Sequence, residues 1–219
     1  MIDLHTHTLW SDGELIPAEH IRRAFMKGYE AIAITDHADA SNIDMLCRQI
    51  VQFSDAMARA ESDITVLPGV ELTHVMPEEI AELTQYARAH GAKIVVVHGE
   101  TIVEPVRPGT NCAAIEAKVD ILAHPGLILP EEAELAAKNG VYLEITSKSG
   151  HSLSNGHVAK TALAAGASLV IDTDSHRPGD FIDEAFAEKV LIGCGLTPME
   201  IDRVFENSRQ IVKRKLSGG

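Results

Sequence analysis

The chain has 219 residues, of which 45% are hydrophobic and 23% are charged. This composition excludes a disordered chain and fits one compact domain with a full hydrophobic core. The 19 Lys and Arg residues stand against 32 Asp and Glu residues, so the formal net charge is −13. Binding to nucleic acid in general needs a cationic surface, so we expect no nucleic-acid partner.

Short apolar runs alternate with helical patterns along the chain. The first strand is expected directly at the amino terminus, where Ile2 and Leu4 alternate with Asp3, His5 and His7. Further strands are predicted at 30–37, 64–71, 93–98, 120–124, 142–146 and 168–174. Apolar residues three and four apart predict the helices between them, which are expected after Pro17, over 43–57, 80–87, 113–118 and 130–139, before Gly166, and twice after 176. Two sequences resemble capping boxes, Ser41 with Asp44 and Thr197 with Glu200.

This order predicts an α/β fold with seven parallel strands. Strands that read as near-continuous Val, Ile and Leu runs are buried on both faces, as in parallel sheets covered by helices. Polar residues follow nearly every strand, which favours a single-domain (β/α)7 barrel of the TIM type over an open sheet. An open sheet would gather them at one switch point instead.

Histidines and carboxylates recur at the carboxyl ends of the predicted strands. Two imidazoles on one strand face beside a carboxylate suit zinc, manganese or iron, although one His-x-His pair arises by chance as easily. The repetition at later strands is the stronger signal, and it comprises His5, His7, Asp12, His37, Glu71, His98, His124, Asp174 and His176. His20 and His90 fall on predicted helices and are expected at the surface, while the place of His74 stays open.

Taken together, these motifs resemble those of the PHP (polymerase and histidinol phosphatase) family. The resemblance covers residues 2–176, with C-terminal helices over 177–219, and implies a distorted (β/α)7 barrel over 1–219 that holds three divalent metal ions. The motifs that carry it are His5-Thr-His7, Ser-Asp12-Gly, Thr-Asp-His37, Pro-Gly-Val-Glu71, Val-His98-Gly, Ala-His124-Pro and Asp174-Ser-His176.

The resemblance also implies how the ligands are shared among the ions. The first ion would be held by His5, His7, Glu71 and Asp174. Glu71 would bridge to a second ion held by His98 and His124, and the third would be held by Asp12, His37 and His176. Some members have His in place of Asp12, so the metal at each position (Zn, Mn or Fe) stays open. Asp172 and Glu144 point inward, either to orient ligands during catalysis or to form hydrogen bonds inside the barrel.

The function implied is a metal-dependent phosphoric ester hydrolase acting on a small phosphorylated metabolite, with histidinol phosphate suggested first. We expect a hydroxide shared by the first two metals to attack a phosphomonoester in line. The rival readings are a phosphodiesterase or nucleotide phosphatase on the same cluster, an accessory domain of the DNA-polymerase type, and a metal-binding protein without activity. The chain ends near Gly219 with no polymerase module attached, which speaks against the accessory domain.

Substrate contacts are expected from the long loops that follow the strands. The candidates are Arg107, Thr110, Asn111, Lys148, His151, Asn155, His157 and Arg177, although such residues are also ordinary in turns. His151 or His157 could protonate the leaving alcohol, as could a metal-bound water.

The cellular location follows from three features. No apolar run approaches the ~20 residues that a membrane span needs, so no membrane association is expected. The strand that starts at Ile2 leaves no room for a signal peptide. The three cysteines are far apart and fit reduced thiols in the cytoplasm.

Overall fold

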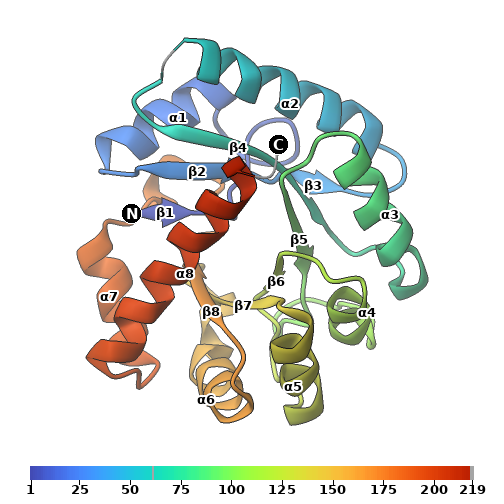
Figure 1. Ribbon diagram of the computed structural model, residues 1–219, viewed down its shortest axis with the longest axis vertical. Coiled ribbons are helices and arrows are strands. Elements are labelled where there is room, and N and C mark those ends of the chain that lie inside the picture. Colours follow the sequence, from blue (N-terminus) through green and yellow to red (C-terminus); the bar gives the residue numbers. More distant parts are fainter. Residues whose placement is uncertain (61, 218–219) are drawn as a thin grey trace.

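The computed structural model describes residues 1–60 and 62–217, and it contains a parallel, nearly closed barrel (Figure 1). Its strands follow one another around the ring in the order β1 (Ile2–Asp3), β2 (Ala31–Ile34), β4 (Thr65–Leu72), β5 (Ile94–His98), β6 (Ile121–Ala123), β7 (Tyr142–Thr146) and β8 (Leu169–Asp172). The two-residue strand β3 (His37–Ala38) resumes the course of β2 and also pairs with β4. The predicted seven-stranded α/β barrel of the TIM type is therefore confirmed.

Helices cover the outer face of the barrel, as Figure 1 shows. They are α1 (Pro17–Met26), α2 (Ile43–Arg59), α3 (Pro77–Ala89), α4 (Thr110–Glu116), α5 (Pro130–Asn139), α6 (Asn155–Ala165) and α7 (Glu184–Gly193), with 3₁₀ turns at His151–Ser154 and Pro178–Asp180. The last helix is α8 (Pro198–Ser217). Proline, whose fixed φ suits the first helical turn, begins α1, α3 and α5. Gly140 and Gly166 end α5 and α6 at φ 71° and 72°, a conformation that glycine adopts without strain.

Two local predictions were wrong. His20 is buried, with its ring 4.8 Å from that of Phe181, because it lies on the same face of α1 as Ile21 and Ala24. The Ser41 capping box does not form, since the Ser41 hydroxyl donates to Asp39. By contrast, His90 is exposed as expected. At the other predicted box, the backbone N–H and the hydroxyl of Thr197 both donate to the Glu200 carboxylate.

The ring closes between β8 and β1 at the carboxyl ends of the strands. Thr6 bridges Ser175, the N–H of His7 donates to the Ser175 carbonyl at 2.9 Å, and the N–H of Asp174 donates to the His5 carbonyl at 3.0 Å. These contacts draw the first and last metal-ligand motifs together, although about 170 residues separate them. Closure of the barrel therefore brings the first motif, with His5 and His7, next to the last motif, with Asp174.

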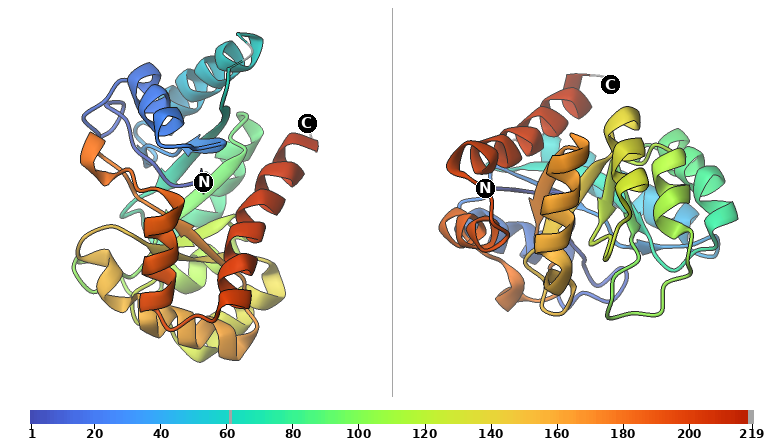
Figure 2. Two further views of the ribbon diagram at one scale, coloured as in Figure 1. Left: turned by 90° about the vertical axis from the view of Figure 1, so that its left-hand side faces the viewer. Right: turned by 90° about the horizontal axis from the view of Figure 1, so that it is seen from below.

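The last helix, α8, packs across the opposite end of the barrel (Figure 2). Its Ile211 and Val212 belong to the same apolar cluster as interior strand residues such as Leu4 and Ile94. Lys215 then forms an ion pair with Asp120, which directly precedes β6. The amino-terminal mouth is thus filled with hydrocarbon, and the polar residues gather at the other mouth. Among the described residues, no helix is long and apolar enough to span a bilayer.

Candidate metal centre

The nine predicted metal ligands meet at the carboxyl-terminal mouth of the barrel. Glu71 lies at the centre on β4, fully buried, with Oε1 3.2 Å from Nε2 of His5 and 3.9 Å from Nε2 of His124. Its Oε2 lies 3.9 Å from Nε2 of His7. Asp174 faces the same histidines, with Oδ1 3.2 Å from His7 and Oδ2 3.9 Å from His124. The two carboxylates therefore contact histidines that come from strand ends in both halves of the barrel.

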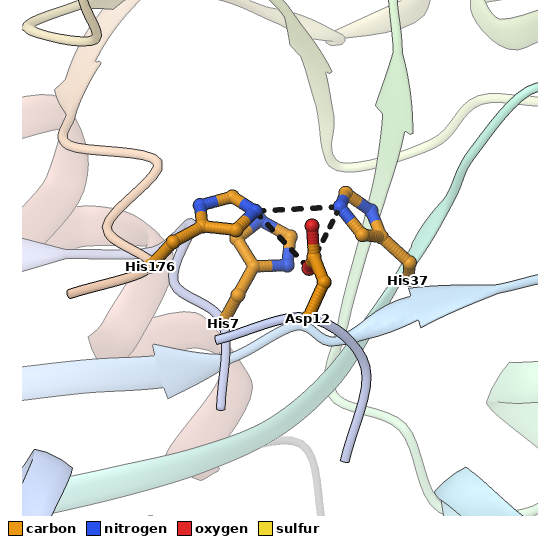
Figure 3. Close-up of side chains that lie close together, drawn as sticks. All are labelled: His7, Asp12, His37 and His176. Atoms are coloured by element: carbon orange, nitrogen blue, oxygen red, sulfur yellow. Dashed lines mark hydrogen bonds and ion pairs between the residues drawn. The ribbon is translucent and has the colours of Figure 1, made fainter. Parts of the chain in front are cut away.

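A second group of four ligands lies beside this centre (Figure 3). Asp12 Oδ1 is 3.2 Å from Nε2 of both His37 and His176, and these two nitrogens are 3.4 Å apart. His7 stacks on His176 with ring centroids 4.2 Å apart. The ligand atoms of all four side chains lie within 4.8 Å of one another, which is close enough for one ion. Asp12 is the exposed member, so this group opens to solvent.

The chemistry of these side chains fits divalent cations. Six buried ligand atoms make no hydrogen bond within the described residues, namely Nε2 of His5, both ring nitrogens of His7 and His124, and Oε1 of Glu71. Leaving such a group without a partner costs about 1–3 kcal/mol, so a converging set calls for a ligand. Two atoms bound to one ion at about 2.0–2.2 Å each lie roughly 3–4 Å apart, as these do.

Glu144 lies behind the ligands on β7 and orients two of them. Its Oε1 is 2.6 Å from Nδ1 of His5, and its Oε2 accepts the backbone N–H of His124 at 2.9 Å. A carboxylate on Nδ1 leaves Nε2 free to face the ion. Asp172 is also buried, but its Oδ1 accepts the backbone N–H of Leu4 at 2.6 Å and so joins β8 to β1. The geometry places Asp172 beneath the ligands, away from the cavity wall.

The charges in this cluster perturb one another strongly. Burial opposes protonation of His37, but the Glu71 and Asp12 carboxylates outweigh it and raise the pKa of His37 to about 10. Burial and the charge of His37 lower the pKa of His7 to about 3. Burial also opposes protonation of His5, yet Glu144 and Glu71 hold its pKa well above the usual value. Without an ion, the neighbouring carboxylates therefore favour the protonated forms of His5 and His37, and despite its burial Glu104 and Glu71 also raise the pKa of His98.

These protons predict a pH-dependent affinity for metal. His37 must lose its proton to bind an ion, and its pKa of about 10 keeps it protonated below that pH. The apparent affinity should therefore rise by about tenfold per pH unit for each proton displaced. Chelator competition between pH 6 and 9 measures this rise, and calorimetry in two buffers of different ionisation enthalpy counts the protons released. An affinity that does not change with pH would contradict the assignment.

Five of the nine predicted ligands line a cavity of about 520 Å³, namely Asp12, His37, His98, Asp174 and His176. Three of the predicted substrate contacts, Lys148, His151 and Arg177, lie in its wall. Lys148 Nζ donates to the Asp174 carbonyl at 2.7 Å and lies 3.8 Å from Asp174 Oδ1. Its ammonium therefore stands beside the ligands as a fixed positive charge. His151 is mostly buried and stacks on His124 with ring centroids 4.2 Å apart.

The structure does not bring the other predicted substrate contacts to this cavity. The Asn155 amide is buried and forms two hydrogen bonds with the backbone of Thr146. His157 Nε2 donates to the Ile128 carbonyl at 2.8 Å, outside the cavity wall. These two side chains stabilise the loops that follow β6 and β7, and their predicted roles in binding and proton transfer find no support in the geometry.

The loop after β5 uses its polar residues in the same way. Asn111 accepts the N–H of Glu100 and donates to the Pro125 carbonyl, while the Thr110 hydroxyl donates to the carbonyl of Arg107. Arg107 itself is exposed on this loop and does not line the cavity. Its role as a phosphate contact stays a prediction.

Two residues of the wall had no clear signal in the sequence. Glu104 lies in an irregular loop and contacts His98, His74 and His151. His74, which the sequence left open, follows β4 with φ 55°, a left-handed conformation that is strained for a residue with a side chain. No repeated spacing marks either position, so only the folded chain shows that they meet.

Comparison with known proteins gives three related findings. The PHP domain family model matches residues 3–99. The "Uncharacterized protein MJ1295" of Methanocaldococcus jannaschii is 48% identical over 214 residues, which cover 97% of this chain and 98% of that protein. A "Probable phosphatase" of Shewanella pealeana is 28% identical over 214 residues, with 87% of this chain and 83% of that protein covered.

A solved structure supports the fold independently. It is the crystal structure of a candidate histidinol phosphatase, hisK, from Listeria monocytogenes, and it matches with a TM-score of 0.62. The match covers 86% of this chain and 99% of that chain. At 12% sequence identity, this likeness concerns the barrel and not the chemistry.

Proposed function

Because the chain belongs to the PHP domain family, we propose that it is a metal-dependent phosphoesterase that hydrolyses a small phosphomonoester. The observation that carries this proposal is the cluster of buried ligand atoms without hydrogen-bond partners among the described residues, which adjoins further predicted ligands that line a cavity together with Lys148. His5, His7, Glu71 and Asp174 would hold a first ion, Glu71 with His98 and His124 a second, and Asp12, His37 and His176 a third.

Divalent ions, when bound, neutralise charge on phosphoryl oxygens and make water a nucleophile near neutral pH. The protein's own part is to hold the phosphate and to keep the ligands in place. Lys148 offers an ammonium beside Asp174, and Arg177 extends the positive charge at the rim of the cavity. His151, a histidine of the wall that is not among the predicted metal ligands, would exchange a proton with the leaving alcohol.

The size and charge of the site favour a small anionic substrate. A cavity of about 520 Å³ suits a metabolite of modest size. The formal net charge of −13 would repel a phosphate, so the ions and Lys148 must supply the local attraction. A phosphomonoester of the histidinol phosphate class stays a prediction that rests on the sequence motifs, since the likeness to the Listeria monocytogenes protein concerns the fold alone. A cytoplasmic location and the absence of a nucleic-acid partner stay predictions.

A phosphate-release screen tests the proposal. Protein loaded with Mn²⁺, Zn²⁺ or Fe²⁺ is offered p-nitrophenyl phosphate, bis-p-nitrophenyl phosphate and a library of phosphorylated metabolites, and the metal content of each sample is measured. We expect turnover of monoesters, lost in His98→Ala because a buried ligand is removed. The exposed His90→Ala is the matched control and should keep its activity. Preference for the diester would favour a phosphodiesterase, and no turnover by metal-loaded protein would reject an enzyme.

A further inference from the structure

One carboxylate in the cavity wall belongs to none of the strand-end motifs. Glu104 lies exposed on the loop between β5 and α4, with 38% of its side chain accessible, and its carboxylate contacts three imidazoles. Its Oε2 is 3.1 Å from Nε2 of His98 and 3.2 Å from Nε2 of His74, and its Oε1 is 3.4 Å from Nε2 of His151. A single carboxylate therefore faces one predicted metal ligand and two further histidines.

The loop that carries Glu104 is tied at both ends. The Thr101 hydroxyl is 2.8 Å from Nδ1 of His151, and the N–H of Val106 donates to the Glu104 carbonyl at 2.9 Å. Further along, Oε1 of Glu100 accepts the backbone N–H groups of Gly109 and Asn111. These bonds fix the backbone on either side of Glu104, so its carboxylate is presented to the cavity by a preorganised loop.

We propose that Glu104 is an additional metal ligand, at the ion position that His98 and His124 share. The proposal rests on the metal centre proposed above but not on the hydrolysis of any ester. His98 Nδ1 lies 3.2 Å from the carbonyl of Gly99, to which it can donate, so Nε2 is the nitrogen left for an ion. Glu104 Oε2 lies 3.1 Å from that nitrogen, the separation of two neighbouring ligands on one ion.

The electrostatics of the cavity also support Glu104 as a metal ligand. A free carboxylate beside the place of a phosphate would repel the substrate, whereas a carboxylate bound to a cation is neutralised. The imidazole of His124 stacks on His151, and the ligand atoms of His98, His124 and His151 lie within 4.8 Å of one another. The ligand atoms of His74, His98 and Glu104 likewise lie within 4.8 Å of one another, so His98 belongs to both groups and brings Glu104 next to the His124 position.

His74 has a positioning role in this arrangement. Its Nε2 faces Oε2 of Glu104, and its ring lies 4.9 Å from that of His98. Carboxylate ligands commonly accept a hydrogen bond from a neighbouring group, which holds the oxygen toward the ion. The strained φ of 55° at His74 brings the ring to this place. A second carboxylate beside Glu71 would also favour manganese or iron over zinc at this ion.

The test measures metal binding directly. Metal-free wild type, Glu104→Gln, His74→Ala and Glu116→Gln are titrated with Mn²⁺ and Co²⁺ against a competing chelator, and the visible spectrum of bound Co²⁺ reports its coordination. We expect Glu104→Gln to weaken one ion at least about tenfold and to change the cobalt spectrum, with a smaller effect in His74→Ala. Glu116 is exposed at the end of α4, so Glu116→Gln is the matched control and should bind like wild type.

Two results would overturn the proposal. Unchanged metal affinity and an unchanged cobalt spectrum in Glu104→Gln would show that Glu104 is not a ligand. Tighter binding of inorganic phosphate in that variant would show instead that the Glu104 carboxylate competes with phosphate for the cavity. The proposed function fails in a different way. Wild type that binds its ions but hydrolyses no phosphoester would reject the phosphatase and leave the ligand assignment standing.

Discussion

Replacing Glu71 by Gln is expected to lower phosphoester hydrolysis by more than about 100-fold. Glu71 is fully buried and lies within 3.9 Å of ligand nitrogens from His5, His7 and His124. Gln keeps the shape of the side chain but removes the negative charge that two ions would share. Changes to residues that merely support ligands already cost 10–100-fold in metal affinity or activity, so loss of the central carboxylate should cost more.

Steady-state kinetics together with metal analysis would separate the possible causes. Glu144→Gln is the comparison variant, since Glu144 supports His5 and His124 without facing the cavity. We expect it to lose about 10–100-fold, less than Glu71→Gln. Circular dichroism checks that both variants fold. Equal activity of Glu71→Gln and wild type, with metal bound in both, would contradict the central role of Glu71.

The barrel and the ligand series could be predicted from the sequence for a physical reason. A strand such as β5, with Ile94 and three valines before His98, is buried on both faces and so gives a continuous apolar run that ends where the chain reaches the mouth. The candidate metal ligand directly follows the last apolar residue of the strand. Each motif is therefore local, and the closed fold then brings the motifs together.

Features that depend on tertiary contact could not be predicted in this way. The apolar face of α8 fits any surface helix, and nothing in its spacing tells that Ile211 enters the barrel core. Glu104 is one acidic residue in a loop until the fold places His98 and His74 beside it. The sequence predicts Asn155 as a substrate contact because turns and binding sites use the same residue types, whereas its amide forms hydrogen bonds with Thr146.

Burial of His20 could have been predicted, because the spacing of Pro17, His20, Ile21 and Ala24 already traces one face of a helix. At His20, the position on the helix face outweighs the polar character of the side chain. The same spacing shows why the metal ligands differ from His20. They sit after strands, where side chains at the mouth meet one another, and not on a helix face that packs against the barrel.

Removing the metal ions is expected to lower the melting temperature by about 8–16 °C for each ion lost. An ion held at a concentration 1,000-fold above its dissociation constant adds about 4.1 kcal/mol to the free energy of unfolding. In a chain of 150–250 residues, each kcal/mol shifts the melting temperature by about 2–4 °C. The reason is local: without ions, six buried ligand atoms at the carboxyl-terminal mouth have no hydrogen-bond partner in the described part of the chain.

Thermal unfolding in matched buffers, with and without a chelator, measures this difference. The Glu71→Gln variant should show a smaller loss, because it lacks the carboxylate that lies between the His5 and His124 nitrogens. Adding back Mn²⁺ should restore wild type in proportion to the ions rebound. If chelation left the melting temperature unchanged while metal analysis showed the ions gone, the buried cluster would be satisfied without metal. The apolar packing of α8 against the amino-terminal end would then account for the stability of the barrel, without any contribution from the ligand cluster at the carboxyl-terminal mouth.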